Sequence, residues 1–91
     1  MIIVSYDISD NKKRTRFSKY LSKFGYRLQY SVFSIDNSER LLNIIKNDIQ
    51  NKFSKAFDET DSVIILKLSN TCEVIKYGYA KNNDAELLVV T

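Results

Sequence analysis

The chain has 91 residues, of which 44% are hydrophobic and 27% are charged, and its formal net charge is +3. This length predicts one domain with a single core, marginal in stability as an isolated monomer. We expect no membrane span and no secretory signal, and therefore a cytoplasmic protein without a membrane partner. The single cysteine, Cys72, excludes an internal disulfide and a cysteine-cluster zinc site. The chain contains no histidine, so any hydrolytic chemistry must rely on carboxylates and a metal ion.

The first eight residues are an apolar, partly β-branched run that predicts a buried strand. Asp7 closes this run with a charge that a core strand does not normally bury unpaired. Its carboxylate is therefore expected to bind a cation, to pair with an arginine, or to lie exposed at the strand tip. Asp7 is the best-placed carboxylate for metal-dependent hydrolysis, and a structural salt bridge to Arg14 or Arg27 is the alternative.

A helix is expected next, capped by Ser9 or Asp10 and starting near Asn11. Gly25 is expected to end it in a left-handed conformation. The helical spacing of its apolar residues predicts one buried, aromatic-rich stripe. That stripe consists of Phe17, Tyr20, Leu21 and Phe24.

Positive charge is segregated here, because residues 11–35 hold seven cations and no acid. Such segregation is typical of a chain that binds a polyanion, whereas a solvated helix face usually mixes both signs. Arg14 is expected to project toward the strand tips, away from the main basic stripe. The residues expected to contact nucleic acid are Lys12, Arg14, Arg16, Lys19, Lys23 and Arg27.

Residues 27–36 are predicted to be extended, as one strand or as two short strands separated by a kink. Asp36, followed three residues later by Glu39, resembles a capping box that opens a second helix. A cluster of acids marks the turn out of that helix. These acids are Asp58, Glu59 and Asp61.

Further strands are expected at residues 62–68, 73–79 and 85–90. The β-α-β-(β)-α-β order predicts an α+β, ferredoxin-like sandwich with both helices on one face of the sheet. We expect one domain over residues 1–91, with a core at 1–78 and a C-terminal loop and strand at 79–91. The C-terminal strands have no obvious place in a four-stranded sheet, which predicts that they extend the sheet of a second subunit in a homodimer.

Two stretches of the sequence together form a pattern that is more specific than either one alone. Tyr6-Asp7-Ile8 closes the first strand, with Arg14 and Arg16 in the following helix, and residues 25–33 read Gly-Tyr-Arg-Leu-Gln-Tyr-Ser-Val-Phe. In this register the chain resembles the small CRISPR-associated endonuclease family, the smaller of the two proteins that acquire spacers in bacterial and archaeal immunity. The resemblance is close over about the first 36 residues and looser beyond them.

The resemblance implies a ferredoxin-like homodimer whose two-fold axis brings the two copies of Asp7 face to face. It implies phosphodiester cleavage of RNA or DNA with Mg²⁺, or another divalent cation such as Mn²⁺, in some members. In other members it implies a scaffold role beside the integrase subunit. By position, Asp7 is the metal-site carboxylate and Tyr6 lies beside it. The residues that match positions implicated in nucleic-acid handling or activity are Arg14, Arg16, Arg27 and Phe33.

Several alternatives remain open. Phe33 either stacks on a base or packs in the dimer interface, and packing is favoured. The leading function is a metal-dependent endonuclease of CRISPR adaptation, and the alternative is a non-catalytic dimeric DNA-binding scaffold for the integrase subunit. A ferredoxin-like toxin ribonuclease or a plain RNA-binding module is a third possibility. The RNA-binding module is disfavoured because the strands lack the aromatic and basic signature of an RNA recognition motif.

Overall fold

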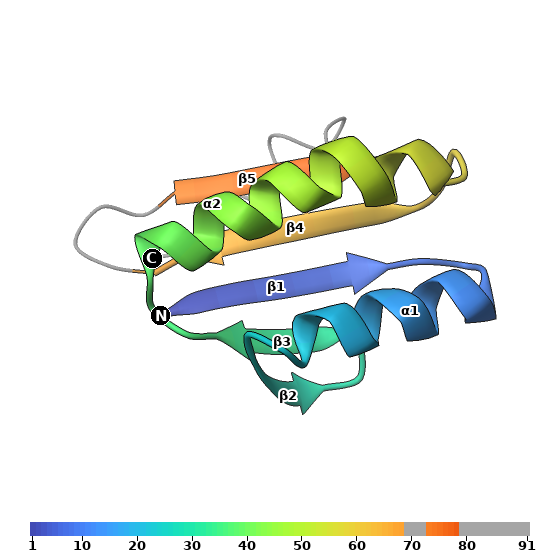
Figure 1. Cartoon of the computed structure of the whole chain (residues 1–91). Coiled ribbons are helices and arrows are strands. Elements are labelled where there is room, and N and C mark those ends of the chain that lie inside the picture. Colours follow the sequence, from blue (N-terminus) through green and yellow to red (C-terminus); the bar gives the residue numbers. More distant parts are fainter. Residues whose placement is uncertain (69–72, 79–91) are drawn as a thin grey trace.

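The computed structural model describes residues 1–68 and 73–78, where two helices are placed among five strands (Figure 1). Within these residues a π-helical turn (Ile49–Phe53) and a 3₁₀ turn (Ser54–Ala56) continue directly from the second helix. The elements are β1 (Ile2–Asp7), α1 (Asn11–Leu21), β2 (Gly25–Gln29), β3 (Val32–Ile35), α2 (Glu39–Asp48), β4 (Ser62–Lys67) and β5 (Glu73–Gly78).

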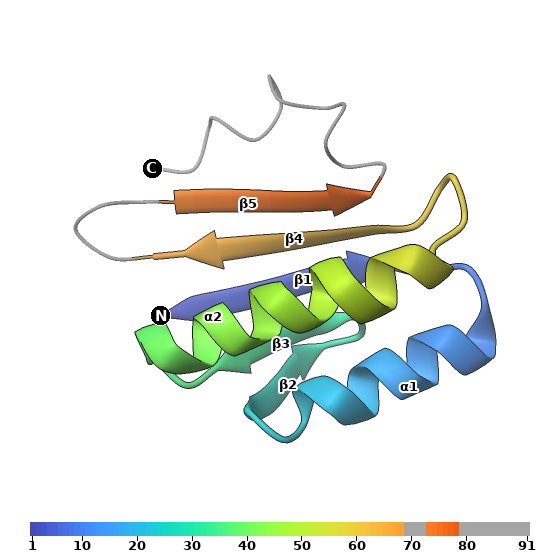
Figure 2. The same ribbon diagram turned by 45° about the horizontal axis from the view of Figure 1, so that its top comes forward.

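The strands form one sheet in the order β2-β3-β1-β4-β5, and all neighbours are antiparallel. The first four strands and the two helices have the βαββαβ order of a ferredoxin-like α+β fold, as predicted. Both helices lie on the same face of the sheet in the two views of Figures 1 and 2. None of the helices among residues 1–68 and 73–78 is long and apolar enough to cross a membrane.

The expectation that the C-terminal strands have no place in the subunit's own sheet is wrong for β5. This strand pairs with β4 along its whole length, from Ser62 opposite Gly78 to Lys67 opposite Glu73. A four-stranded ferredoxin-like sheet leaves the outer edge of β4 unpaired, and β5 satisfies its backbone groups. The strand expected at residues 85–90 lies outside the described residues.

The start of α1 is confirmed and its predicted end is corrected. The Asp10 side chain accepts a hydrogen bond from the backbone N–H of Lys13 at 2.9 Å and so caps the helix. Gly25 does not end the helix in a left-handed conformation; it opens β2. A Cβ at Gly25 would lie 1.9 Å from the carbonyl oxygen of Ser34, so a close approach between β2 and β3 requires glycine here.

Residues 27–36 form two strands. The chain turns at Ser31, whose φ of 66° is left-handed, and the register of the β2–β3 pair shifts between Arg27 and Gln29. Helix α2 also starts later than predicted, because Ser38 rather than Asp36 caps it by accepting from the N–H of Leu41.

The core lies between the helices and the sheet. The predicted aromatic stripe is part of it: Phe17 is fully buried, and Tyr20 and Phe24 pack against the buried cluster. The Tyr20 hydroxyl donates a 2.6 Å hydrogen bond to Asp48 and so joins α1 to α2. Burial and this neighbouring carboxylate raise the pKa of Tyr20. The buried sheet residues are Ile2, Val4, Tyr6, Phe33, Ile35, Val63 and Ile65.

The sheet face opposite the helices mixes apolar and polar side chains, and its apolar ones are half-buried. Side chains alternate along a strand, so the buried Ile2, Val4 and Tyr6 place Ile3, Ser5 and Asp7 on the opposite face. Neighbouring strands add apolar residues beside Ile3. These residues, which we call the open face, are Ile3, Val32, Ile64 and Leu66.

Candidate nucleic-acid and carboxylate site

Asp7 is the last residue of β1 and lies exposed at the edge of the open face. Its backbone pairs with Ser62 of β4. The carboxylate makes no hydrogen bond or ion pair with any residue among 1–68 and 73–78. The strand tip therefore presents a solvated, unpaired negative charge.

Arg14 is fixed beside the end of β1 by a backbone carbonyl and an amide side chain, not by a carboxylate. Its Nη1 donates to the carbonyl oxygen of Ile8 at 2.9 Å, and its Nη2 donates to the side chain of Asn11. Its Cζ lies 5.8 Å from the centre of the Tyr30 ring, a cation–π distance. The expected projection of Arg14 toward the strand tips is confirmed.

Arg27 is also engaged away from Asp7. Its Nη2 donates to the hydroxyl of Ser18 on α1, and its Cζ lies 5.2 Å from the centre of the Phe33 ring. The structural salt bridge between Asp7 and Arg14 or Arg27 is therefore not formed. The carboxylate remains available for a cation.

Tyr6 and Phe33 are buried within the protomer. The Tyr6 ring contacts Phe17 edge-on at 5.1 Å and stacks near Phe33 at 6.3 Å. Phe33 is only 1% exposed, so it cannot stack on a base in this conformation, and it packs in the subunit's own core rather than at an interface. Phe33 thus supports the site by packing under Tyr6 and Arg27.

A hollow of about 430 Å³ brings several of the expected residues together. We call it the β1-end hollow. Tyr6 lines it from β1, and its hydroxyl has no hydrogen-bond partner among the described residues. In that part of the chain every fully buried polar side-chain atom does have a partner. The hydroxyl therefore reaches accessible space. The other lining residues used below are Arg14, Thr15, Ser18, Lys19, Arg27 and Tyr30.

A second hollow, which we call the α1 groove, continues along the helix. It has a volume of about 440 Å³ and shares Thr15 and Lys19 with the β1-end hollow. Lys12 and Arg16 complete its cationic lining. Lys23 is exposed but lines neither hollow. The arrangement is a continuous basic path along α1, suited to a row of phosphates.

The hydroxyl and aromatic residues of this site are not among those predicted from the sequence. Ser18 and Ser22, the residue that follows α1, come after Arg14 at intervals of four, which places them on the same side of the helix as Arg14. That spacing was a signal that the serines share the hollow with the arginine. Tyr30 gave no such signal, because its position depends on the turn at Ser31.

A divalent cation fits this site only if a second carboxylate is supplied. The described residues contain no group of three or more carboxylate or thiol side chains that could hold a metal. Mg²⁺ is usually held by one or two carboxylates together with water and phosphate oxygens. One protomer contributes Asp7 alone, and a second copy paired across the open face would contribute another.

Comparison with known proteins agrees with these features. The family model described as CRISPR associated protein Cas2 matches residues 1–74. A CRISPR-associated endoribonuclease Cas2 of Mycobacterium tuberculosis is 30% identical over 89 residues, covering 97% of this chain and 74% of the relative. Cas2 3 of Chloroflexus aurantiacus, also named an endoribonuclease, is 39% identical over 80 residues (84% and 81%). Cas2 2 of Thermus thermophilus, named an endonuclease, is 32% identical over 76 residues (82% and 80%).

Proposed function

This chain belongs to the CRISPR-associated Cas2 family, and from that premise we propose that it is a metal-dependent endonuclease. Its substrate is RNA or DNA, its working form is a homodimer, and its setting is spacer acquisition in the cytoplasm. The names of its relatives, endoribonuclease and endonuclease, support phosphodiester cleavage. The lone cysteine, Cys72, fits a reducing compartment but lies outside the described residues.

The observation that carries the proposal is the free carboxylate of Asp7 on the open face. A carboxylate with a structural role would accept hydrogen bonds or pair with one of the nearby arginines, and Asp7 does neither with a described residue. Because Asp7 shares its face with Ile3 and Ser5, a second copy packed on this face would bring another Asp7 near it. Two carboxylates meet the preference of Mg²⁺ or Mn²⁺ for hard oxygen ligands.

A cation held by the two carboxylates would lower the pKa of a bound water and neutralise charge on the phosphate. The chain's own residues supply the other requirements. Arg14 offers a guanidinium already oriented by Ile8, so little side-chain entropy is lost when it binds a phosphate. Arg27 and Lys19 add positive charge around the β1-end hollow, and the Tyr6 hydroxyl offers a free donor there.

The test is a cleavage assay of the purified protein on RNA, single-stranded DNA and duplex DNA. The assay is run in EDTA and then with Mg²⁺ or Mn²⁺ added. We expect metal-dependent cleavage of at least one substrate. Asp7→Asn should lower its rate by on the order of 100-fold or more, because nucleophile activation and charge neutralisation are each worth several kcal/mol.

The same variant provides its own control for folding. Removing two opposed carboxylates relieves repulsion in the metal-free dimer, so Asp7→Asn should keep the fold and slightly stabilise that dimer. Nucleic-acid binding should change little, because the basic path along α1 is untouched. Wild-type cleavage by Asp7→Asn would assign the activity to a contaminant or another site.

The second candidate is a non-catalytic dimeric scaffold that binds DNA and docks the integrase subunit. The continuous basic path favours it, since that path binds phosphates whether or not any bond is broken. If neither wild type nor Asp7→Asn cleaves, while both support spacer acquisition with the integrase subunit, the scaffold function is correct and the nuclease proposal is wrong.

A further inference from the structure

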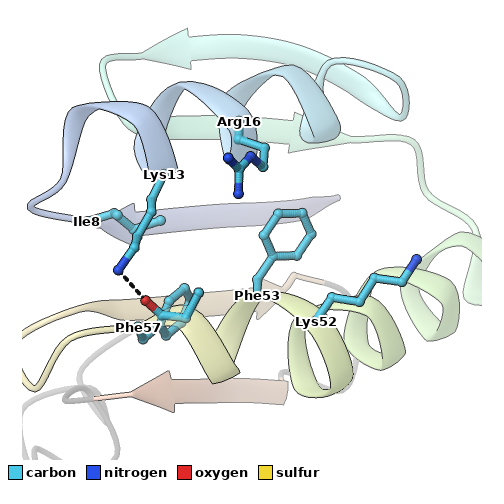
Figure 3. A pocket seen from close by; sticks show the side chains of 7 residues that line it. Ile8, Lys13, Arg16, Lys52, Phe53 and Phe57 are labelled. Atoms are coloured by element: carbon cyan, nitrogen blue, oxygen red, sulfur yellow. Dashed lines mark hydrogen bonds between the residues drawn. The ribbon is translucent and has the colours of Figure 1, made fainter.

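A third hollow lies between α1 and the chain that follows α2, and the proposed cleavage site does not use it. We call it the Phe57 pocket (Figure 3). Its volume is about 200 Å³. Ile8, Phe53 and Phe57 form its apolar wall, and Lys13, Arg16 and Lys52 provide its cations.

The apolar wall suits one flat ring system. A cavity of about 150 Å³ is large enough for benzene, so this pocket has room for a slightly larger ring. Phe53 is held edge-on against Phe17, with ring centres 5.0 Å apart, which fixes one side of the pocket. Phe57 is half-buried and packs at the edge of the core.

The cations of the pocket differ in availability. Lys13 donates to the carbonyl oxygen of Ala56 at 2.5 Å and lies 3.8 Å from Asp58. Lys52 has Asp48 at 3.8 Å and points away from the pocket in Figure 3.

Arg16 is the available cation. It has no hydrogen-bond or ion-pair partner among the described residues, and it points from α1 toward Phe53. The pocket therefore combines an apolar ring site with one free guanidinium at its mouth.

The pocket also joins the basic path. Arg16 lines both the Phe57 pocket and the α1 groove, where Lys12 and Lys19 are its cationic neighbours. A strand whose phosphates follow α1 would reach the mouth of the pocket at Arg16. The base attached at that point is the ring nearest to the apolar wall.

From this arrangement we propose that the Phe57 pocket binds one unpaired nucleobase of a single-stranded nucleic acid, with the adjacent phosphate on Arg16. The inference rests on the proposed function and narrows its substrate to strands with an unpaired base. The bases of an intact duplex are stacked and cannot enter the pocket. Insertion of a base against aromatic side chains favours binding by about 5-fold or more per base and tolerates any sequence.

The test uses two fluorescein-labelled probes of equal length and charge: a short oligothymidylate, and the same backbone with every base removed. Both are titrated with full-length protein in EDTA, and anisotropy gives each affinity. Wild type should prefer the base-bearing strand by about 5-fold or more.

Two variants should bring that ratio close to one. Ala56→Leu fills the pocket from an exposed position, and Phe57→Leu keeps apolar bulk but removes the ring. If Ala56→Leu lowers the melting temperature of the protein, the conclusion rests on Phe57→Leu instead. Asn43→Leu, an exposed position that lines none of the three hollows, is the matched control and should keep the wild-type ratio.

Each contrary result has its own meaning. If wild type binds neither probe but binds duplex DNA, the base pocket is overturned and the proposed function stands. If it binds neither probe nor duplex DNA, the proposed function fails together with this inference. Equal binding of both probes would leave the nuclease and scaffold functions standing and overturn the base pocket alone. A preference that survives in both pocket variants would also overturn it, because the base would then bind outside this pocket.

Discussion

At the residue scale, the carboxylate of Asp61 fastens the β1–α1 loop to the turn that precedes β4. It is fully buried and accepts from the backbone N–H of Ser9 at 3.0 Å, the Ser9 hydroxyl at 3.1 Å and the N–H of Asp58 at 2.9 Å. Burial alone would raise the pKa of Asp61, but these hydrogen bonds and the nearby Lys13 outweigh it and lower the pKa. The charged form is therefore the one that stabilises the fold.

Asp61→Asn should lower the free energy of unfolding at neutral pH by about 1–3 kcal/mol, since an amide group cannot accept all three hydrogen bonds. Because the folded pKa is lowered, the stabilisation is complete above the ordinary carboxyl pKa of about 3.9 and is lost as pH falls through the folded pKa. Urea unfolding at neutral and at acid pH measures the difference. A gap between wild type and variant that stays constant with pH would contradict this account. Glu59→Gln, an exposed neighbour, is the control and should change little.

At the element scale, α1 presents its basic path to solvent over the α1 groove. Replacing Lys12 and Lys19 with Gln removes two phosphate contacts, so the slope of log affinity against log salt should fall by roughly 1.8 on duplex DNA and 1.4 on a single strand. Binding should weaken for all sequences alike, because phosphate contacts carry no sequence information. Titrations at several salt concentrations measure the slope.

The matched control places the same charge loss on α2. Arg40→Gln combined with Lys46→Gln removes two cations that line none of the three hollows. It should leave the slope near the wild-type value. Equal flattening by both double variants would show that net charge, rather than the α1 path, governs binding.

The elements could be predicted largely from local signals, because each depends on nearby residues. The spacing of Phe17 and Tyr20 and the cap at Asp10 located α1, and the charge pattern located its basic side. The prediction that Gly25 ends α1 is wrong because glycine is needed here for a different reason. The backbone of Ser34 on the neighbouring strand leaves no room for a Cβ, and local sequence does not reveal that contact.

The same distinction applies to the site. Position and residue type are enough to predict Asp7 and Arg14 as site residues. That the two do not pair with each other could not be predicted, because Arg14 is held by the carbonyl oxygen of Ile8, a contact formed only in the fold. The left-handed turn at Ser31 and the three hydrogen bonds to Asp61 are likewise tertiary effects. The Phe57 pocket joins residues of α1 to residues about 40 positions later, so no local spacing could predict it.

At the scale of the whole molecule, the half-buried apolar residues of the open face favour dimerisation. Ile64 lies on β4 beside Ser5 of β1, in the middle of this face and on the same side of the sheet as Asp7. Covering this apolar face with a second copy would remove it from water and bring a second Asp7 toward the first. Two exposed residues of the edge strand β2 extend the available apolar surface. They are Tyr26, 61% exposed, and Leu28, 46% exposed.

Light scattering should show the wild type as a dimer at low micromolar concentration and Ile64→Lys as a monomer at the same concentration. Burying an unpaired ammonium costs several kcal/mol, which would raise the dissociation constant by about 100-fold or more. Ile44→Lys places the same charge on α2, where Ile44 is already 36% exposed, and should remain dimeric. A dimeric Ile64→Lys would contradict pairing through the open face.

Truncation after Gly78 distinguishes dimerisation through the open face from dimerisation by exchange of the strand expected at residues 85–90. We expect the truncated chain to dimerise more weakly, because it loses the strand predicted to extend the partner's sheet. Dimerisation as strong as that of wild type would contradict strand exchange and leave the open face alone to hold the two copies together.

Cleavage gives an independent readout of pairing, because one chain supplies only one Asp7 carboxylate. If Ile64→Lys is monomeric and inactive while its melting behaviour shows it to be folded, the site requires two chains. If it is monomeric and fully active, Asp7 works without its symmetry mate, and the proposed pairing of carboxylates is wrong.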